Sequence, residues 1–431
     1  MNYDLYIFDY DGTVCNSFEG FKSSVAYMLE YFHLPVPSDD TIRSCIGPPL
    51  LHSLTCILKV DPALHEEASI IYRKHFTEYG NQYFSMYAGI RTVLQSLRQS
   101  GAKVALATSK PIGPTLTLLK QFGLTELFDS INAPENDKVK NSKEFAIGEA
   151  LKVPHASAVM IGDRKYDAQG AKFHNVDFVG VNYGFADAGE LEATEAIAVA
   201  ESPMDLLRIF NVPAITGKFI SMEGMDGCGK TTQLHLLQEK LNKFGFLFDY
   251  TREPGGTAIG EKIRELVLSV ENSEMCARTE ALLYAAARAQ HVEQRIKPSL
   301  QTGKHVLCDR FVDSSIAYQG GGRKLGKNNV QAINAFAIDQ TMPDKTIYLS
   351  MDAEKSLQRR VQASVLDRLE SEKTEFFLQT KAVYDALVQE NPERFIEINA
   401  DDTIENIADQ VFFKLVSYLE PQVNWEACKH E

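Results

Sequence analysis

Phe219-Ile-Ser-Met-Glu-Gly-Met-Asp-Gly-Cys-Gly-Lys-Thr231 decides the fold of the second half of this chain. An apolar run leads into the pattern G-x-x-x-x-G-K-[ST], and a segment with helical spacing, residues 232–244, follows it. In this setting the glycines let backbone N–H groups surround phosphate oxygens at the start of a helix, and Lys230 reaches the outer phosphates. The stretch therefore predicts a parallel α/β domain that binds ATP.

For two residues of this phosphate loop we make separate predictions. Thr231 is expected to bind Mg²⁺ through its hydroxyl. Cys228 is interpreted as a small filling side chain and not as a nucleophile. The residues expected to bind ATP are Gly224, Met225, Asp226, Gly227, Cys228, Gly229, Lys230, Thr231 and Thr232.

On both sides of the loop, short apolar runs alternate with amphipathic helical stretches, which is typical of parallel α/β sheets. The expected strands of the first half are residues 5–9, 103–108, 158–163 and 178–181. Those of the second half are residues 219–223, 247–251, 305–309, 346–350 and 395–399. We expect two doubly wound parallel-sheet α/β domains that differ in motif order, without an internal repeat.

The chain of 431 residues is too long for a single core. A helix that ends near Asn211 is followed by a connector bounded by Pro and Gly. We therefore expect domains over residues 1–211 and 218–420, a linker over 212–217 and a tail over 421–431. A helical insertion over about residues 14–88 follows the first strand. Its aromatic residues are expected to form the core of a small helical bundle: Phe18, Phe21, Tyr27, Tyr31 and Phe32.

Composition restricts the partners that this chain can have. There are 44 Lys and Arg against 58 Asp and Glu, a formal net charge of −14. Because such a chain is repelled by nucleic acids and anionic membranes, we expect neither as a partner and favour small anions held in local pockets. Seven scattered cysteines without CxxC pairs indicate a reducing compartment. Without a basic leader or an apolar run of 18 residues, a cytoplasmic location is expected.

The first expected strand of the chain delivers Phe8-Asp-Tyr-Asp-Gly-Thr13. Two carboxylates spaced by two residues, Asp9 and Asp11, can face the same side at a strand end. Their like charges need a counter-ion, and Mg²⁺ would meet that need and screen an incoming phosphate. One carboxylate could then attack phosphorus while the other shuttles protons. The pattern favours a phosphate-transferring site over a simple Asp-Gly turn.

Here the sequence resembles the haloacid dehalogenase-like (HAD) hydrolases. Thr108, at the end of the run Val104-Ala-Leu-Ala107, matches the family's second motif, whose hydroxyl binds the phosphoryl group. Lys143 matches the third motif, the lysine that neutralises nucleophile and phosphate, because it is expected to open a helix. Lys138 and Lys140 are nearby rivals.

The fourth HAD motif corresponds to Val159-Met-Ile-Gly-Asp163 and Asp167. Because these two carboxylates lie four residues apart where a turn becomes a helix, both can reach one cation. The resemblance implies a Rossmann-like core with an inserted helical cap and the metal ligands Asp9, Asp11, Asp163 and Asp167. Ile46-Gly-Pro-Pro-Leu50 and Val181-Asn-Tyr-Gly184 resemble the phosphoglycolate phosphatase, pyrophosphatase and nucleotidase branch. A small phosphate ester is thus the implied substrate, and motifs do not identify which one.

The second half resembles the thymidylate kinases in three further segments, Thr251-Arg-Glu-Pro-Gly-Gly-Thr257, Leu283-Tyr-Ala-Ala-Ala-Arg-Ala-Gln-His291 and Cys308-Asp-Arg310. The resemblance implies transfer of phosphate from ATP to dTMP. It implies that Asp226 and Asp309 organise Mg²⁺ with Thr231. The residues implied in dTMP binding are Arg264, Tyr284, Arg288, Arg310, Ser314, Tyr318 and Gln319, with Arg310 on the monophosphate and Tyr284 stacked on thymine.

A lid of the kinase type is expected over residues 357–370. Thymidylate kinases supply a catalytic arginine either from the phosphate loop or from the lid, and this loop has Gly227 where the first kind places arginine. The lid must therefore provide it, with Arg359 as the candidate and Arg360 and Arg368 as alternatives. Val361 and Ala363 depart from the family, because lid-arginine enzymes commonly have basic residues there.

The expected catalytic residues are Asp9, Asp11, Thr108 and Lys143 in the first half and Lys230, Arg310 and Arg359 in the second. Together the motifs predict a bifunctional enzyme, a Mg²⁺-dependent phosphatase joined to a dTMP kinase. A first half that is a non-catalytic or regulatory module is the alternative. A third possibility keeps both activities without any exchange of substrate. The kinase resemblance also implies a homodimer.

Overall fold

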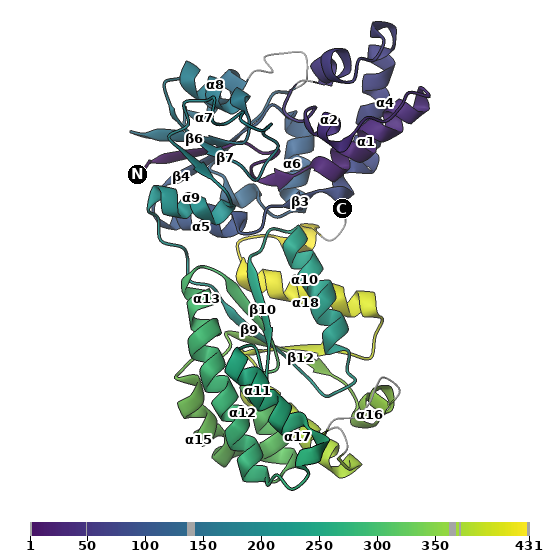
Figure 1. Ribbon diagram of the computed structural model, residues 1–431, viewed down its shortest axis with the longest axis vertical. Coiled ribbons are helices and arrows are strands. Elements are labelled where there is room, and N and C mark those ends of the chain that lie inside the picture. Colours follow the sequence, from purple (N-terminus) through teal and green to yellow (C-terminus); the bar gives the residue numbers. More distant parts are fainter. Residues whose placement is uncertain (1, 49, 136–142, 362–367, 370–371, 429–431) are drawn as a thin grey trace. The chain divides into compact units, whose positions relative to one another are not determined.

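The computed structural model describes residues 2–48, 50–135, 143–361, 368–369 and 372–428 (Figure 1). The chain forms two compact units. Unit 1 comprises Met1–Ile215, Asn242–Phe246 and Gln422–Glu431, and unit 2 comprises Thr216–Leu241 and Leu247–Pro421. In the part of the chain that the structure describes, no helix combines the length and the apolar character that crossing a membrane requires.

Unit 1 is built on a six-stranded parallel sheet in the order β5-β4-β1-β6-β7-β8. Its strands are β1 (Leu5–Phe8), β4 (Lys103–Ala107), β5 (Ser130–Asn132), β6 (Ala158–Gly162), β7 (Asp177–Val181) and β8 (Ala198–Ala200). Its helices outside the insertion are α5 (Ile90–Gln99), α6 (Ile112–Gln121), α7 (Lys143–Ala150), α8 (Lys165–Phe173) and α9 (Pro203–Phe210).

Alternation along β1 explains why this sheet is covered on both faces. Tyr6 and Phe8 belong to one apolar cluster, with residues of α5, α6 and α9. Leu5 and Ile7 belong to a second cluster, with residues of α7 and α8. Because successive side chains of a strand point to opposite faces, the two clusters are the two sides of the sheet. This is the expected doubly wound arrangement.

The insertion after β1 forms the helical cap of unit 1. Its helices include α1 (Phe18–Tyr31), α2 (Asp39–Arg43), α3 (Leu50–His52) and α4 (His65–Glu78), and the antiparallel pair β2 (Cys15–Asn16) and β3 (Ser85–Met86) closes its base. Phe18 is buried, whereas Tyr27 and Tyr31 are 49% and 55% exposed. The expectation that all five aromatic residues form a bundle core is therefore wrong for these two tyrosines, which stay about half exposed although the Tyr27 ring stacks on His75 of α4.

Unit 2 is built on a five-stranded parallel sheet in the order β10-β11-β9-β12-β13. The strands are β9 (Phe219–Glu223), β10 (Phe248–Arg252), β11 (His305–Asp309), β12 (Lys345–Ser350) and β13 (Phe395–Asn399). The helices are α10 (Lys230–Lys243), α11 (Ala258–Leu268), α12 (Ala277–His291), α13 (Lys297–Gln301), α14 (Val312–Ser315), α15 (Lys327–Ile338), α16 (Ala353–Val361), α17 (Thr374–Glu390) and α18 (Ile404–Leu419).

The predicted fold class, two α/β units with parallel sheets, is confirmed. All nine expected strands form within one residue of their expected ends. The sequence patterns missed the short strands β2, β3, β5 and β8, which contain two or three residues each. Such strands are too short for alternation to show in the sequence.

Candidate active sites

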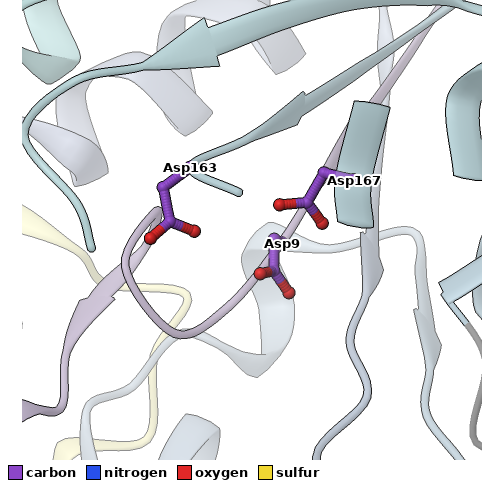
Figure 2. A group of neighbouring side chains, drawn as sticks. All are labelled: Asp9, Asp163 and Asp167. Carbon is purple, nitrogen blue, oxygen red and sulfur yellow. The ribbon is translucent and has the colours of Figure 1, made fainter. Parts of the chain in front are cut away.

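The first site lies at the carboxyl ends of three neighbouring strands of unit 1. Asp9 directly follows β1, Thr108 follows β4 and Asp163 follows β6, and β1 pairs with both other strands. Asp167 lies in the first turn of α8. The carboxylates of Asp9, Asp163 and Asp167 converge (Figure 2), and one oxygen from each lies within 4.8 Å of the others. Two strand ends and the first turn of α8 thus bring three of the four predicted acidic residues to one point.

Among the described residues, Lys143 is the cation that forms ion pairs within this cluster. It is the first residue of α7, its side chain is 8% exposed, and its Nζ lies 2.5 Å from Asp9 Oδ1 and 2.8 Å from Asp167 Oδ1. Burial raises the pKa of Asp9 to about 7 and also raises the pKa of Asp163. One ammonium does not balance three buried carboxylates. The rival residues Lys138 and Lys140 lie outside the described residues.

The carboxylate cluster fits a divalent cation. Asp163 Oδ2 accepts a hydrogen bond from the Phe185 N–H at 2.7 Å, whereas the buried Asp163 Oδ1 accepts none among the described residues. Buried carboxylate oxygens without donors are unfavourable unless a cation approaches. Three carboxylates that offer oxygen ligands suit Mg²⁺. Gly12 makes the close approach possible, because a Cβ there would lie 2.0 Å from Asp163 Oδ2.

Asp11 is not a member of this group. Its Oδ2 pairs with Lys110 Nζ at 3.2 Å, and that ammonium lies over the rings of Phe76 and Phe84 at 4.8 and 5.3 Å from their centroids. Thr108 is buried, and its Oγ1 accepts a hydrogen bond from the Lys110 N–H. Sequence reasoning missed Lys110, although the run Thr108-Ser-Lys110 follows a strand end and could have revealed it.

The second site is a cavity of about 480 Å³ in unit 2. It is bounded by the phosphate loop, the ends of β10 and β11, and helices α11, α12 and α16. All the residues implied in dTMP binding line it: Arg264, Tyr284, Arg288, Arg310, Ser314, Tyr318 and Gln319. From the loop it receives Asp226, Gly227, Gly229, Lys230, Thr231 and Thr232, whereas Met225 and Cys228 are buried. The Gly224 carbonyl accepts hydrogen bonds from Lys230 Nζ and Arg310 Nη1, each at 3.0 Å.

Charges of both signs meet at the phosphate loop. Arg310 pairs with Asp226, whose other oxygen accepts a hydrogen bond from the Tyr318 hydroxyl at 2.8 Å. Burial alone would raise the pKa of Asp226, but the charges of Arg310 and Lys230 hold it at about 2. Asp309 lines the cavity, and its buried Oδ1 accepts no hydrogen bond among the described residues. A cation therefore fits beside Asp309, whereas Asp226 already has an arginine partner.

The lid arginines lie in different surroundings. Arg359 and Arg360 of α16 both line the cavity, and Arg359 Nη2 lies 3.8 Å from Asp401. Arg368 is instead bound to the buried Glu280 at 2.6 Å and is absent from the cavity lining. Ala363, one of the departures from the family, lies outside the described residues. The structure thus brings two of the three candidate arginines to the site.

A tight contact joins α16 to the phosphate loop. The Ser356 hydroxyl donates to the Asp226 carbonyl at 2.7 Å, and a Cβ on Gly227 would lie 2.2 Å from the Ser356 carbonyl oxygen. Gly227 has a φ of +88°, which disfavours any other residue there. The absence of an arginine at this loop position therefore has a structural reason, since a side chain would displace α16.

Comparison with known proteins assigns the two halves to two families. Residues 222–411 match the family "Thymidylate kinase". The chain is 45% identical over 199 residues to a thymidylate kinase of Bacillus pumilus, which covers 46% of this chain and 94% of the relative. It is 46% identical over 204 residues to one of Enterococcus faecalis, covering 46% of this chain and 96% of the relative.

The first half matches a different family. Residues 6–181 match "Haloacid dehalogenase-like hydrolase". Among solved structures, a predicted phosphatase from Clostridium acetobutylicum is 33% identical, with a TM-score of 0.46, and covers 49% of this chain and 99% of that chain. A haloacid dehalogenase-like hydrolase from Streptococcus pneumoniae is 26% identical, with a TM-score of 0.45, and covers 48% of this chain and 98% of that chain.

Proposed function

The second half of this chain belongs to the thymidylate kinase family and its first half to the haloacid dehalogenase-like hydrolases, and we propose that each half acts on phosphate at a site of its own. The second site transfers the γ-phosphate of ATP to dTMP, giving dTDP. The first site removes phosphate from a small phosphate ester. The proposal rests on one observation above the others: each unit gathers its own set of acidic and basic side chains, buried around one point in unit 1 and lining a cavity in unit 2.

In the kinase, the acceptor is already an anion, so positioned cations have to lower the repulsion between the two phosphates. Lys230 would contact the outer phosphates of ATP, and Arg310 would grip the monophosphate of dTMP. Arg359, with Arg360 beside it, would supply positive charge from α16. Thr231, Asp226 and Asp309 are the proposed residues of a Mg²⁺ site, and Mg²⁺ would neutralise charge on the transferred phosphate.

The base of dTMP would occupy the α12 side of the cavity. Tyr284 and Arg288 lie one helical turn apart on α12, and both are buried and line the cavity. An aromatic ring and a guanidinium on one helix face can stack on a pyrimidine and bind its edge. Gln319 lies on the same wall, where its Nε2 donates to Glu280 at 2.9 Å. Ser314 and Tyr318 complete the wall toward Arg310.

In the hydrolase, we propose that Asp9 is the nucleophile. One of its oxygens would form a bond to phosphorus while the bond from phosphorus to the leaving oxygen breaks, and Asp11 would give that oxygen a proton. Water would then attack the aspartyl phosphate, with Asp11 taking its proton, so that Asp9 and inorganic phosphate are regenerated. Lys143 and Thr108 would hold the phosphoryl oxygens. Asp9, Asp163 and Asp167 are the proposed Mg²⁺ ligands, and Mg²⁺ would screen the charge of the substrate.

Reciprocal variants test the two sites in the intact chain. We expect Asp9→Asn to abolish phosphate release and to spare dTMP phosphorylation. We expect Lys230→Ala to do the reverse. Both activities are measured on each purified variant, against a panel of dNMPs, phosphoglycolate and pyrophosphate for the hydrolase. Loss of both activities in either variant would contradict separate sites.

The alternative is a first half without catalytic activity. The intact set Asp9, Thr108, Lys143, Asp163 and Asp167 argues against it, because a docking module does not need these residues buried around one point. If the panel contains no substrate while dTMP phosphorylation depends on the presence of unit 1, a regulatory module becomes the better reading. Turnover of a non-nucleotide ester alone would separate the hydrolase from nucleotide metabolism.

We also propose that unit 2 forms a homodimer. Large apolar side chains are exposed on helices α11, α12 and α15: Ile259, Leu266, Leu282 and Phe336. Phe336 is 91% exposed. Helix α12 packs against both α11 and α15, and large apolar side chains exposed on neighbouring helices can mark an interface. Light scattering coupled to size exclusion should give twice the chain mass for the wild type and the mass of one chain for Phe336→Glu, and a monomeric wild type at micromolar concentration would contradict the proposal.

A further inference from the structure

A buried chain of polar side chains lies behind the base side of the kinase cavity. Thr251 Oγ1 lies 2.8 Å from His291 Nε2, and His291 Nδ1 lies 2.9 Å from Glu253 Oε1. The other oxygen of Glu253 accepts from Arg288 Nε at 2.7 Å. The side chains of His291, Glu253 and Arg288 are 0%, 3% and 2% exposed.

The chemistry of the partners fixes the direction of the two hydrogen bonds to Glu253. An ionised carboxylate can only accept, so Glu253 accepts from Arg288 Nε and from His291 Nδ1. The Thr251 hydroxyl can donate to or accept from the second ring nitrogen, so it serves either form of the imidazole. Glu253 is itself held at the end of β10, where its N–H donates to the Asp309 carbonyl at 2.9 Å. Both oxygens of this carboxylate are therefore placed by rigid elements.

Arg288 has almost no donor left once these contacts are counted. Its Nη1 donates to Ser315 Oγ at 3.0 Å and to Asn334 Oδ1, and its Nη2 donates to the Phe311 carbonyl at 3.1 Å. A guanidinium has five N–H groups, and four of them are now used by the described residues. One N–H of Nη2 remains on a side chain that lines the cavity. A single fixed donor can recognise an acceptor oxygen on a base edge and offers nothing to an amino group.

We infer that His291 is a positioning residue for dTMP recognition, which acts by holding Glu253 so that Arg288 presents its last N–H to the base. The inference rests on the proposed function of unit 2, because it needs the base to bind beside α12. Without His291, the Glu253 side chain keeps, among the described residues, only its hydrogen bond with Arg288 and can turn about its side-chain bonds. Arg288 then loses the fixed acceptor at Nε. The affinity for dTMP falls, whereas ATP, which contacts the phosphate loop, is bound as before.

Four variants separate this role from a general loss of structure. His291→Leu removes both hydrogen bonds at similar volume, and His291→Asn retains a donor that can take the place of Nδ1. Thr251→Val removes only the hydroxyl that contacts His291 Nε2. Glu253→Gln keeps an acceptor but places a donor against His291 or Arg288. Each is measured in the full-length protein for kcat, for KM with dTMP and with ATP, and for melting temperature.

We expect His291→Leu and Glu253→Gln to raise the KM for dTMP by about 10-fold or more, the range for a lost hydrogen bond to a charged group. We expect kcat and the KM for ATP to stay within about threefold, because uniform binding of one substrate is lost. His291→Asn should recover most of the dTMP affinity, and Thr251→Val should resemble the wild type. If His291→Leu does not fold, the KM values for dTMP of Glu253→Gln and His291→Asn are compared with that of the wild type instead.

Two outcomes would overturn the inference, and they differ from failure of the proposed function. If a folded His291→Leu or Glu253→Gln variant has an unchanged KM for dTMP, Arg288 does not depend on its hydrogen bonds through Glu253 to His291. Equal losses in kcat and in both KM values, without recovery in His291→Asn, show a merely structural role. Arg288→Met serves as the reference: if it too leaves the KM for dTMP unchanged, the proposed base site itself is wrong.

Discussion

The ammonium of Lys143 lies 2.5 Å from Asp9 Oδ1, and both side chains are nearly excluded from solvent. The same ammonium contacts Asp167 at 2.8 Å, so one lysine serves two of the three converging carboxylates. Because Asp9 directly follows β1, Lys143 begins α7 and Asp167 lies in α8, this lysine joins three separate segments of unit 1. Its removal should therefore affect folding as well as turnover.

We expect Lys143→Met to lower phosphatase activity by at least about 100-fold, the loss typical of one electrostatic contact to a transition state. We also expect unit 1 to lose roughly 3 kcal/mol of stability in EDTA, because a buried charge cluster loses its cation. Mg²⁺ should recover part of that loss. Calorimetry with and without Mg²⁺ measures both effects. Lys152→Met is the matched control, since that lysine is 71% exposed and pairs with Glu149 on the surface.

An equal loss of stability for Lys143→Met in EDTA and in Mg²⁺ would contradict a metal site at these carboxylates. The phosphatase assay alone would not reveal this, because the lysine could be needed for substrate in either case.

Gly227→Ala should impair the kinase by moving α16. The new Cβ would lie 2.2 Å from the Ser356 carbonyl oxygen, a backbone atom that cannot rotate away, at a φ of +88°. Displacement of about 1 Å in a catalytic element can cost about 100-fold in rate. We expect kcat/KM for ATP to fall by about 10-fold to 100-fold in steady-state assays.

Gly326→Ala is the control for backbone strain. It has a similar φ of +85°, but the nearest atom to its Cβ would be Asn329 Nδ2 at 3.7 Å. Because its ψ of 135° lies outside the left-handed helical region, this variant should lose about 1–3 kcal/mol of stability, and it should keep full kinase activity. If both glycine variants are equally active, the contact between α16 and the loop has no part in catalysis.

Glu223 should make the stability of unit 2 depend on pH. Burial raises the pKa of this carboxyl from 4.5 to about 7, although Phe311 N–H and the hydroxyls of Ser314 and Tyr384 donate to it. Between these values the folded state retains a proton that the unfolded state has released. This carboxyl therefore lowers stability as pH rises through that window, by up to about 3 kcal/mol.

We expect Glu223→Gln to flatten this decline, because the amide has no proton to lose and the two hydroxyls can rotate to meet it. Calorimetry between pH 5 and pH 8 measures the stability of unit 2 in the variant and in the wild type. The unfolding transition of unit 2 is identified by its shift on adding dTMP. A decline as steep in the variant as in the wild type would assign the pH dependence to other groups.

The sequence predicted those residues of the two sites that lie directly after the ends of strands. Asp9 was predicted from its own motif, and Thr108 and Asp163 were predicted from the family resemblance. All three follow predicted parallel strands, whose carboxyl ends meet at one edge of a sheet. Lys143 was reached only through the family resemblance and its expected place at a helix start. These positions depend on the order of elements and not on side-chain detail.

The spacing of residues along the sequence could not predict the direction in which each side chain points. Asp11 was predicted as a metal ligand on its distance of two residues from Asp9, yet it pairs with Lys110 outside the carboxylate group. Its place depends on how the chain turns at Gly12 after β1 ends. His291 stood in a quoted motif without a role, because its partners lie in a segment about 40 residues away and only the fold brings them together.

Tyr284 should be the aromatic surface on which thymine stacks. It is buried in α12 and its side chain lines the cavity. Stacking of a base on an aromatic ring contributes about 1–3 kcal/mol, so we expect Tyr284→Ala to raise the KM for dTMP by about 10-fold to 100-fold. Tyr284→Phe keeps the ring and should stay within about 10-fold of the wild type. Steady-state kinetics with dTMP and ATP varied separately measure both, and equal KM values for the Ala and Phe variants would place the base elsewhere.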